Sequence, residues 1–120
     1  MRNYLVIILP IAAILFFSCS SSQYKNVEAS LPDLTQKADG SYPGEANFKG
    51  VPTSVTLETV IKNHKIISIN IIRHSASPIG KKAEKITDTI IERQSLDVDV
   101  VSGATISSNA IRKAVENSLR

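Results

Sequence analysis

The chain has 120 residues, 14 of them Lys or Arg and 11 of them Asp or Glu, which gives a formal net charge of +3 at pH 7. This length suffices for one domain, and a charge so weak and scattered, with few aromatic residues, does not support nucleic-acid binding. The single cysteine excludes an internal disulfide, a CxxC redox pair, a thiolate zinc cluster and a CxxCH haem attachment.

Residues 1–18 are predicted to be a signal peptide. Arg2 precedes an apolar run from Tyr4 to Phe17, which is shorter than the roughly 20 residues that a spanning helix needs and has the size of a signal-peptide core. The run ends at Cys19, and a cysteine in this position resembles the lipobox of bacterial lipoproteins. The resemblance implies a lipid on Cys19 and a place in the bacterial cell envelope, outside the cytoplasm. The alternative is a buried free cysteine in a short core helix.

Residues 19–39 are predicted to be the lipidated cysteine and a flexible tether. Ser20–Asp39 is mostly polar and shows no sustained apolar period, which favours a solvated segment. Such a segment has an end-to-end distance on the order of 20 to 25 Å, enough to hold a domain near a membrane. The folded domain is then expected to span residues 40–120.

Three strands are predicted at the start of this domain. Residues 40–48 are expected to form a short edge strand, because Pro43 cannot donate a ladder hydrogen bond. Residues 55–61 and 67–72 alternate with period two, and the polar residues 62–64 between them predict a hairpin. The apolar faces are expected to be formed by Val55, Leu57, Thr59 and Ile61, and by Ile67, Ile69 and Ile71.

Two amphipathic helices are predicted to cover that sheet. Apolar residues recur at helical spacing between Gly80 and Arg93, at Ala83, Ile86 and Ile90, and again from about Ser107 to the C-terminus. Between them, residues 96–101 alternate with period two and predict another strand. The expected fold class is therefore α+β, with a small antiparallel sheet covered by two amphipathic helices.

The segment from Asp99 to Ser108 brings a turn of small and hydroxyl-bearing residues directly into the second helix. The first free amides of that helix would point toward the turn and favour a bound phosphate. Gly103 and Ala104 leave room for a large group to approach the backbone. The alternative is that Ser and Thr here only cap the helix, a contribution of about 1 kcal/mol. Spacing alone does not decide between the two.

The sequence Asp-x-x-Ser-Gly-Ala-Thr, from Asp99 to Thr105, resembles the flavinylation motif of the FMN-binding domain family. That family includes the FMN-carrying subunits of sodium-pumping quinone reductases and electron-bifurcating complexes. The resemblance extends over residues 39–119, since residues 39–44 are similar to the family's opening, the hairpin ending in His74 to its middle, and residues 94–97 to the segment before the motif.

The resemblance implies that a separate flavin transferase, using FAD and magnesium, joins FMN to the Thr105 hydroxyl through a phosphoester. Thr105 would be an acceptor rather than a catalytic nucleophile, and Ser102 is a rival acceptor. Ser102, Gly103 and Ala104 would serve recognition and close approach, while Asp99 would be read by the transferase or fix the turn. The protein would then carry electrons to or from a membrane or envelope redox partner, rather than act as a stand-alone enzyme.

Three further side chains need an interpretation, and two of them have a functional one beside the ordinary one. His74 lies at a strand end, where it is either a plain polar residue or close to the isoalloxazine ring. His64 lies in a predicted turn and is expected to be solvated. Tyr42 either stacks on the flavin or packs at the edge strand. Two separated histidines do not supply the three or four converging ligands of a metal site, so none is expected.

Other functional classes remain open beside the electron carrier. An accessory lipoprotein could bind a partner, or FMN without a covalent bond, and have no redox role. A reductase with its own substrate would need an NAD fingerprint, which the sequence lacks. A hydrolase built from Ser102, His74 and Asp99 would lack the GxSxG and SxxK signatures.

Overall fold

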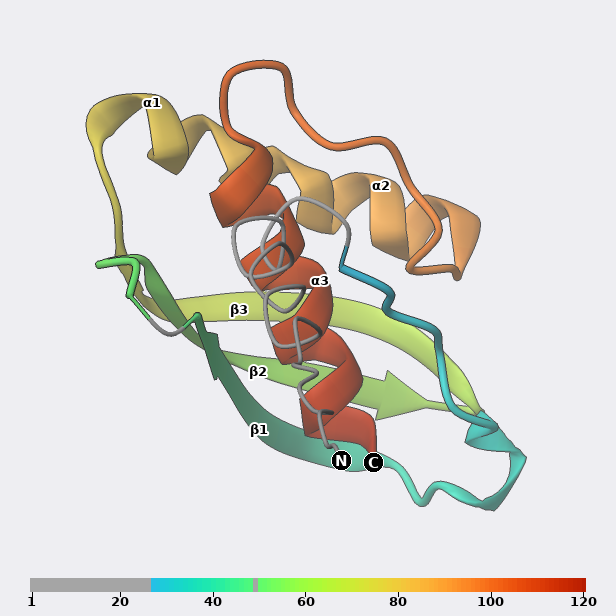
Figure 1. Cartoon of the computed structure of the whole chain (residues 1–120). Coiled ribbons are helices and arrows are strands. Elements are labelled where there is room, and N and C mark those ends of the chain that lie inside the picture. The colour runs from blue at the N-terminus through green and yellow to red at the C-terminus, as the bar shows by residue number, and fades with distance from the viewer. Residues whose placement is uncertain (1–26, 49) are drawn as a thin grey trace, which may run out of the picture.

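A computed structural model describes residues 27–48 and 50–120 of the chain (Figure 1). The expected signal peptide and Cys19 fall in residues 1–26, outside the described residues. A three-stranded antiparallel sheet in the order β1-β2-β3 packs against helices, which confirms the expected α+β fold class. None of the helices in the two described ranges has the length and apolarity that crossing a membrane requires.

The elements follow in chain order as the 3-10 helix η3 (Leu34–Gln36), the strands β1 (Gly40–Asn47), β2 (Ser54–Lys62) and β3 (Lys65–Ser75), the helix α1 (Pro78–Lys81), the 3-10 helix η4 (Lys82–Lys85), and the helices α2 (Ile86–Arg93) and α3 (Thr105–Leu119). Figure 1 shows α3 lying across the sheet, with the segment from α1 to α2 beside its N-terminal half. The buried core between sheet and helices includes Val55, Leu57, Ile61, Ile90, Ile111, Val115 and Leu119.

Strand β1 packs tightly against α3 at Gly44. A Cβ atom there would lie 2.4 Å from the Ala114 carbonyl oxygen and 2.5 Å from the Ser118 Cβ. Only a residue without a side chain allows the helix to pack this close to the strand. Within residues 27–48 and 50–120, β1 pairs with β2 only, so the expectation of an edge strand that tolerates Pro43 is confirmed.

Strands β2 and β3 form the expected hairpin. Its turn is Asn63-His64, and both residues have positive φ, 53° and 64°, as a type I′ turn requires. His64 is exposed, and its Nδ1 atom lies 3.0 Å from the Leu34 carbonyl oxygen.

The predicted alternation of buried residues fails at the start of β3, because this strand contains a β-bulge. Ile61 pairs with Ile66, and Val60 pairs with Ser68, so Ile67 is an extra residue. Ile66 is therefore 1% exposed, whereas Ile67, which we expected on the buried face, is 50% exposed. A strict period of two gives no signal of an inserted residue.

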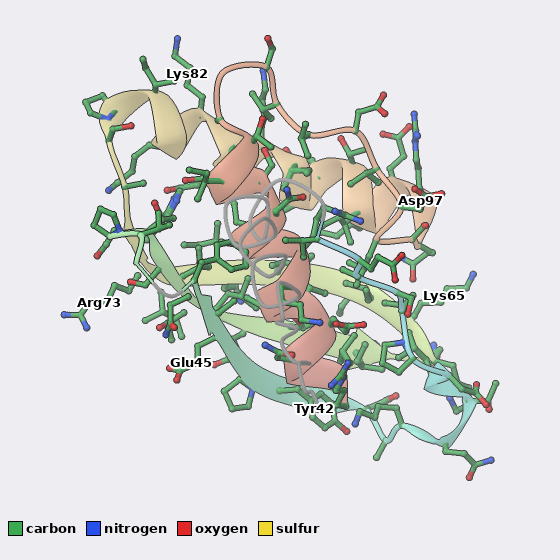
Figure 2. All side chains as sticks on the ribbon, in the orientation of Figure 1. Tyr42, Glu45, Lys65, Arg73, Lys82 and Asp97 are labelled. Carbon is green, nitrogen blue, oxygen red and sulfur yellow. The ribbon has the colours of Figure 1, made fainter. Side chains whose placement is uncertain are left out.

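A second bulge redirects the end of β3. The register shifts between Thr56 and Leu57 of β2, where Ile72 is the extra residue. Continued alternation would have turned Arg73 toward the helices. Instead His74 is buried, and Figure 2 shows Arg73 pointing away from the domain.

The helix expected between Gly80 and Arg93 begins earlier and is interrupted. Ser77 caps α1, its hydroxyl accepting a hydrogen bond of 3.1 Å from the Gly80 N–H, and Pro78 occupies the first turn. A 3-10 segment, η4, then separates α1 from α2. The expected apolar stripe of Ala83, Ile86 and Ile90 is buried, as predicted.

The prediction of a strand at residues 96–101 is wrong. In the described part of the chain the sheet consists of β1, β2 and β3, and this segment is an extended loop. Leu96 and Val98 are buried, and Arg112 Nε donates a hydrogen bond of 2.7 Å to the Leu96 carbonyl oxygen. The period of two therefore reflects one side of a loop packing against helices, not pairing in a sheet.

Part of the segment 27–39, which we expected to belong to a solvated tether, packs against the domain. Leu34 is buried in the core. The Ser30 N–H donates a hydrogen bond of 3.1 Å to Glu116 Oε2 on α3. The packed structure thus begins before Gly40, because widely spaced apolar residues suffice to hold an extended segment even without a regular period.

Replacing Gly44 by alanine should destabilise the fold by about 1 to 3 kcal/mol, because the added methyl group overpacks the contact with α3. Urea unfolding measures this loss as a lower midpoint. Ser41→Ala is the matched control on the exposed side of the same strand, with an expected change within about 0.5 kcal/mol. Equal midpoints for the two variants would show that the contact at Gly44 is not tight.

Protonation of Glu116 in acid should weaken the contact between α3 and the N-terminal segment around Ser30. Burial raises the pKa of this carboxyl, but the hydrogen bonds from Lys113 and the Ser30 N–H outweigh burial and lower the pKa below its ordinary 4.5. The lowered pKa means that ionised Glu116 stabilises the fold above pH 4.5, and that this stabilisation is lost as the pH falls through the folded-state pKa.

Urea midpoints of Glu116→Gln should therefore lie below those of the wild type at pH 7 and approach them as the pH falls below 4.5. A gap between the two proteins that stays constant from pH 7 to about pH 3 contradicts this role of the carboxylate.

Candidate functional site

A tight turn precedes α3. The Ala104 N–H donates a hydrogen bond of 2.8 Å to the Val101 carbonyl oxygen, and Gly103, the third residue of the turn, has a φ of 81°. These are the marks of a type II turn, whose third position favours glycine. The Val101 N–H also donates a hydrogen bond of 2.9 Å to the Ser108 hydroxyl, which connects the β-turn to the start of the helix.

Helix α3 begins directly after this turn without a side-chain cap. Ala104 is the N-cap residue, and no side chain caps the helix there. The first helical hydrogen bond is from the Ser108 N–H to the Ala104 carbonyl oxygen, at 2.9 Å. The Ser and Thr residues of this segment therefore do not cap the helix. The N–H groups of Thr105, Ile106 and Ser107 lie before the first helical hydrogen bond.

A cavity of about 530 Å³ opens at this end of α3. Its wall is formed by Thr53 before β2, by Ala76, Ser77 and Gly80 around the start of α1, and by residues 103–107. Most of these residues are small, and the volume lies in the range of cofactor pockets. In the described part of the chain, no hydrogen bond engages the Thr105 hydroxyl, which is half-buried at the mouth of this cavity.

Behind the cavity wall, three side chains form a continuous hydrogen-bonded chain. His74 Nδ1 lies 2.9 Å from Glu84 Oε2, and His74 Nε2 lies 3.0 Å from the Ser107 hydroxyl oxygen. The His74 side chain is 1% exposed, whereas that of Glu84 is 40% exposed. The chain therefore runs from solvent, through a buried imidazole, to a hydroxyl that lines the cavity.

Sequence reasoning missed Glu84, Ser107 and Thr53. Glu84 and Ser107 lie 10 and 33 residues from His74 along the chain, so no local spacing connects them. His74 was expected either to be an ordinary strand-end residue or to approach the flavin ring. The structure places His74 behind the cavity wall, where its Nε2 meets Ser107, a residue that lines the cavity, and its Nδ1 meets Glu84.

The remaining predicted site residues do not line this cavity. Asp99 and Ser102 are exposed and line a separate depression, with Lys82 and Lys85, on the outer side of the turn. The Tyr42 hydroxyl donates a hydrogen bond of 2.6 Å to the Ala38 carbonyl oxygen. Figure 2 shows Tyr42 near the C-terminal end of α3, so the structure does not bring it to the start of that helix.

The residues at the start of α3 fit the phosphate end of FMN. Three backbone N–H groups and the positive end of the helix dipole suit an anionic group, and Gly103 carries no side chain that would obstruct it. Thr105 offers a hydroxyl with no protein partner in the described ranges. The flat ring would need the cavity beyond, whose small side chains leave space for it.

Comparison with known proteins gives a matching family model and several similar proteins. A family model described as FMN-binding domain matches residues 50–120. An uncharacterized protein of Treponema pallidum (strain Nichols) is 38% identical over 84 residues, covering 68% of this chain and 23% of that protein. A urocanate reductase of Eggerthella lenta is 33% identical over 81 residues, covering 66% of this chain and 13% of the reductase. The chain thus spans less than a quarter of the length of these relatives.

Replacing Gly103 by alanine should strain the turn, because its φ of 81° disfavours any side chain. We expect a loss of about 1 to 2 kcal/mol in urea unfolding, with changed amide NMR shifts for residues 105–107. Ser102→Ala, at the neighbouring exposed position, should stay within about 0.5 kcal/mol of the wild type. If both variants unfold at the same urea concentration, the turn does not need glycine.

Proposed function

The chain belongs to the FMN-binding domain family, and we propose that it is an extracytoplasmic electron-transfer protein with FMN attached covalently to Thr105 through a phosphoester. One observation carries the proposal. The Thr105 hydroxyl, which has no partner in the described ranges, lies in the uncapped first turn of α3, beside a cavity of about 530 Å³.

The first turn of α3 supplies the electrostatic part of the site. The N–H groups of Thr105, Ile106 and Ser107 donate to phosphate oxygens, and the helix dipole favours their negative charge. An ester to Thr105 holds the phosphate at this position, so the cofactor is not lost by dissociation outside the cell.

Attachment requires a second protein. A threonine hydroxyl needs an activating base, and in the described part of the chain the one histidine near the cavity bonds to Ser107, not to Thr105. A flavin transferase with magnesium supplies that base: the bond between Thr105 Oγ and the FMN phosphorus forms, the bond from that phosphorus to the AMP moiety of FAD breaks, and the hydroxyl proton goes to the transferase. Asp99 and Ser102, exposed on the outer side of the turn, are available for its recognition.

Electron transfer is the role that fits a domain of this size. Bound FMN supplies one- or two-electron chemistry, while this chain positions the cofactor and encloses part of it. The similarity to a urocanate reductase supports a redox role. We also propose that a lipid on Cys19 anchors the protein outside the cytoplasm. The electron donor or acceptor is then a membrane or envelope redox partner, because the anchor keeps the protein near such partners.

Co-expression with and without a flavin transferase tests the attachment. Intact mass of the denatured wild type should show an addition of FMN minus water only when the transferase is present. Thr105→Ala should lose this addition, because no hydroxyl remains at the acceptor position. Ser102→Ala is the matched control and should keep it.

Two outcomes contradict the proposal. An addition that persists in Thr105→Ala places the ester on another residue, with Ser102 the first alternative. Flavin that colours the native protein but is released on denaturation favours an accessory lipoprotein that binds FMN without a covalent bond.

A further inference from the structure

The hydrogen-bonded chain of Glu84, His74 and Ser107 is not used in the attachment of FMN, although it ends at the same cavity. Three separate features build it. The bulge at Ile72 turns His74 inward. Gly80 leaves room for Ser107, because a Cβ at Gly80 would lie 2.7 Å from the Ser107 hydroxyl oxygen. The third is Glu84, whose carboxylate meets His74 Nδ1 at 2.9 Å.

From this arrangement we propose that His74 controls the direction of the Ser107 hydroxyl, and thereby whether Ser107 donates a hydrogen bond to the phosphate of the attached cofactor. This proposal rests on the attachment of FMN at Thr105. It makes His74 a positioning residue, which acts on the cofactor only through Ser107.

The direction of each hydrogen bond follows from the donor and acceptor inventory. An ionised Glu84 can only accept, so His74 Nδ1 carries a proton in either state of the ring. When His74 is neutral, its Nε2 has a lone pair and the Ser107 hydroxyl donates to it. When His74 is protonated, Nε2 donates to the Ser107 oxygen, and the hydroxyl proton of Ser107 is free to turn toward the cavity.

The cavity side offers the partner for that freed donor. Ser107 lines the cavity, and its N–H is one of the three that precede the helical ladder of α3. A phosphate ester held at the start of α3 carries a negative charge at this place, and a hydroxyl donor adds to the three amide donors. Protonation of His74 and the bond from Ser107 to the phosphate are therefore linked, and each favours the other.

The charged groups around His74 are few. Its ring bonds to Glu84 on η4, and its register partner on β2 is the uncharged Val55. The other charged residues on β3, α1 and η4 near this site are exposed, and no ion pair in the described ranges joins them to His74 or Glu84; they are Arg73, Lys81, Lys82 and Lys85.

Phosphorus NMR of the flavinylated protein tests the link directly. A phosphodiester has no proton to exchange between pH 5 and 8, so any step in its chemical shift over this range must come from a neighbouring group. A phosphomonoester, in contrast, titrates itself with a pKa of about 6. We expect one step in the wild type, and the same step in His64→Gln, where the exposed turn histidine is removed.

The step should vanish in His74→Gln and in Ser107→Ala, and should return in Ser107→Thr, which restores the hydroxyl. Should His74→Gln fail to fold, the pair of Ser107 variants still decides the question. In-gel flavin fluorescence of denatured protein confirms that each variant carries the cofactor.

Three other outcomes overturn either this inference alone or the proposed function as well. A phosphodiester signal that is flat in the wild type overturns the inference and leaves the attachment at Thr105 standing. A step that survives in Ser107→Ala shows that the titrating group acts on the phosphate without the Ser107 hydroxyl, which also overturns the inference. A signal that titrates as a monoester in every variant shows that FMN is not esterified, and overturns both the proposed function and this inference.

Discussion

The first turn of α3 leaves three backbone N–H groups outside the helical ladder, and the residues around it are placed so that no side chain caps them. The nearby Ser108 hydroxyl does not cap the helix, because it accepts a hydrogen bond from the Val101 N–H and fixes the turn. A side-chain cap contributes about 1 kcal/mol to a typical helix. Its absence here leaves those donors available, and an anionic group at this end of the helix dipole restores a comparable stabilisation. The phosphate of FMN would be such a group, and the proposed ester at Thr105 would hold it at this end of the helix.

The position of that turn depends on close packing elsewhere in the domain. Gly44 lets α3 lie directly on β1, and Gly80 lets α1 approach Ser107, so that the start of α3 and the start of α1 both line one cavity. The bulge at Ile72 gives β3 an additional residue and turns His74 inward. Bulges often redirect a side chain next to a functional site. Here the redirected imidazole joins solvent-exposed Glu84 to the cavity wall.

Much of the fold follows from local pattern, and much of the site does not. The three strands, the hairpin turn and the two apolar helical stripes are visible as periods of two and 3.6 residues, because each element has one face on the core. The bulges at Ile67 and Ile72 are not visible, since an extra residue changes pairing without changing composition. Residues 96–101 imitate a strand because a loop packed on one side has the same alternation. The turn before Thr105 could be recognised from small and hydroxyl-bearing residues that follow one another in the chain. The partnership of His74 with Ser107 could not, because it joins positions 33 residues apart.

The central proposal is that Thr105, in the uncapped first turn of α3, carries FMN. The most direct measurement is tandem mass spectrometry of the peptide that trypsin releases between Arg93 and Arg112, from protein isolated from its native host. We predict fragment ions that place one flavin phosphate on Thr105, between unmodified Ala104 and unmodified Ile106. A peptide recovered without any addition, or with the addition on Ser102 or Ser107, would contradict that claim.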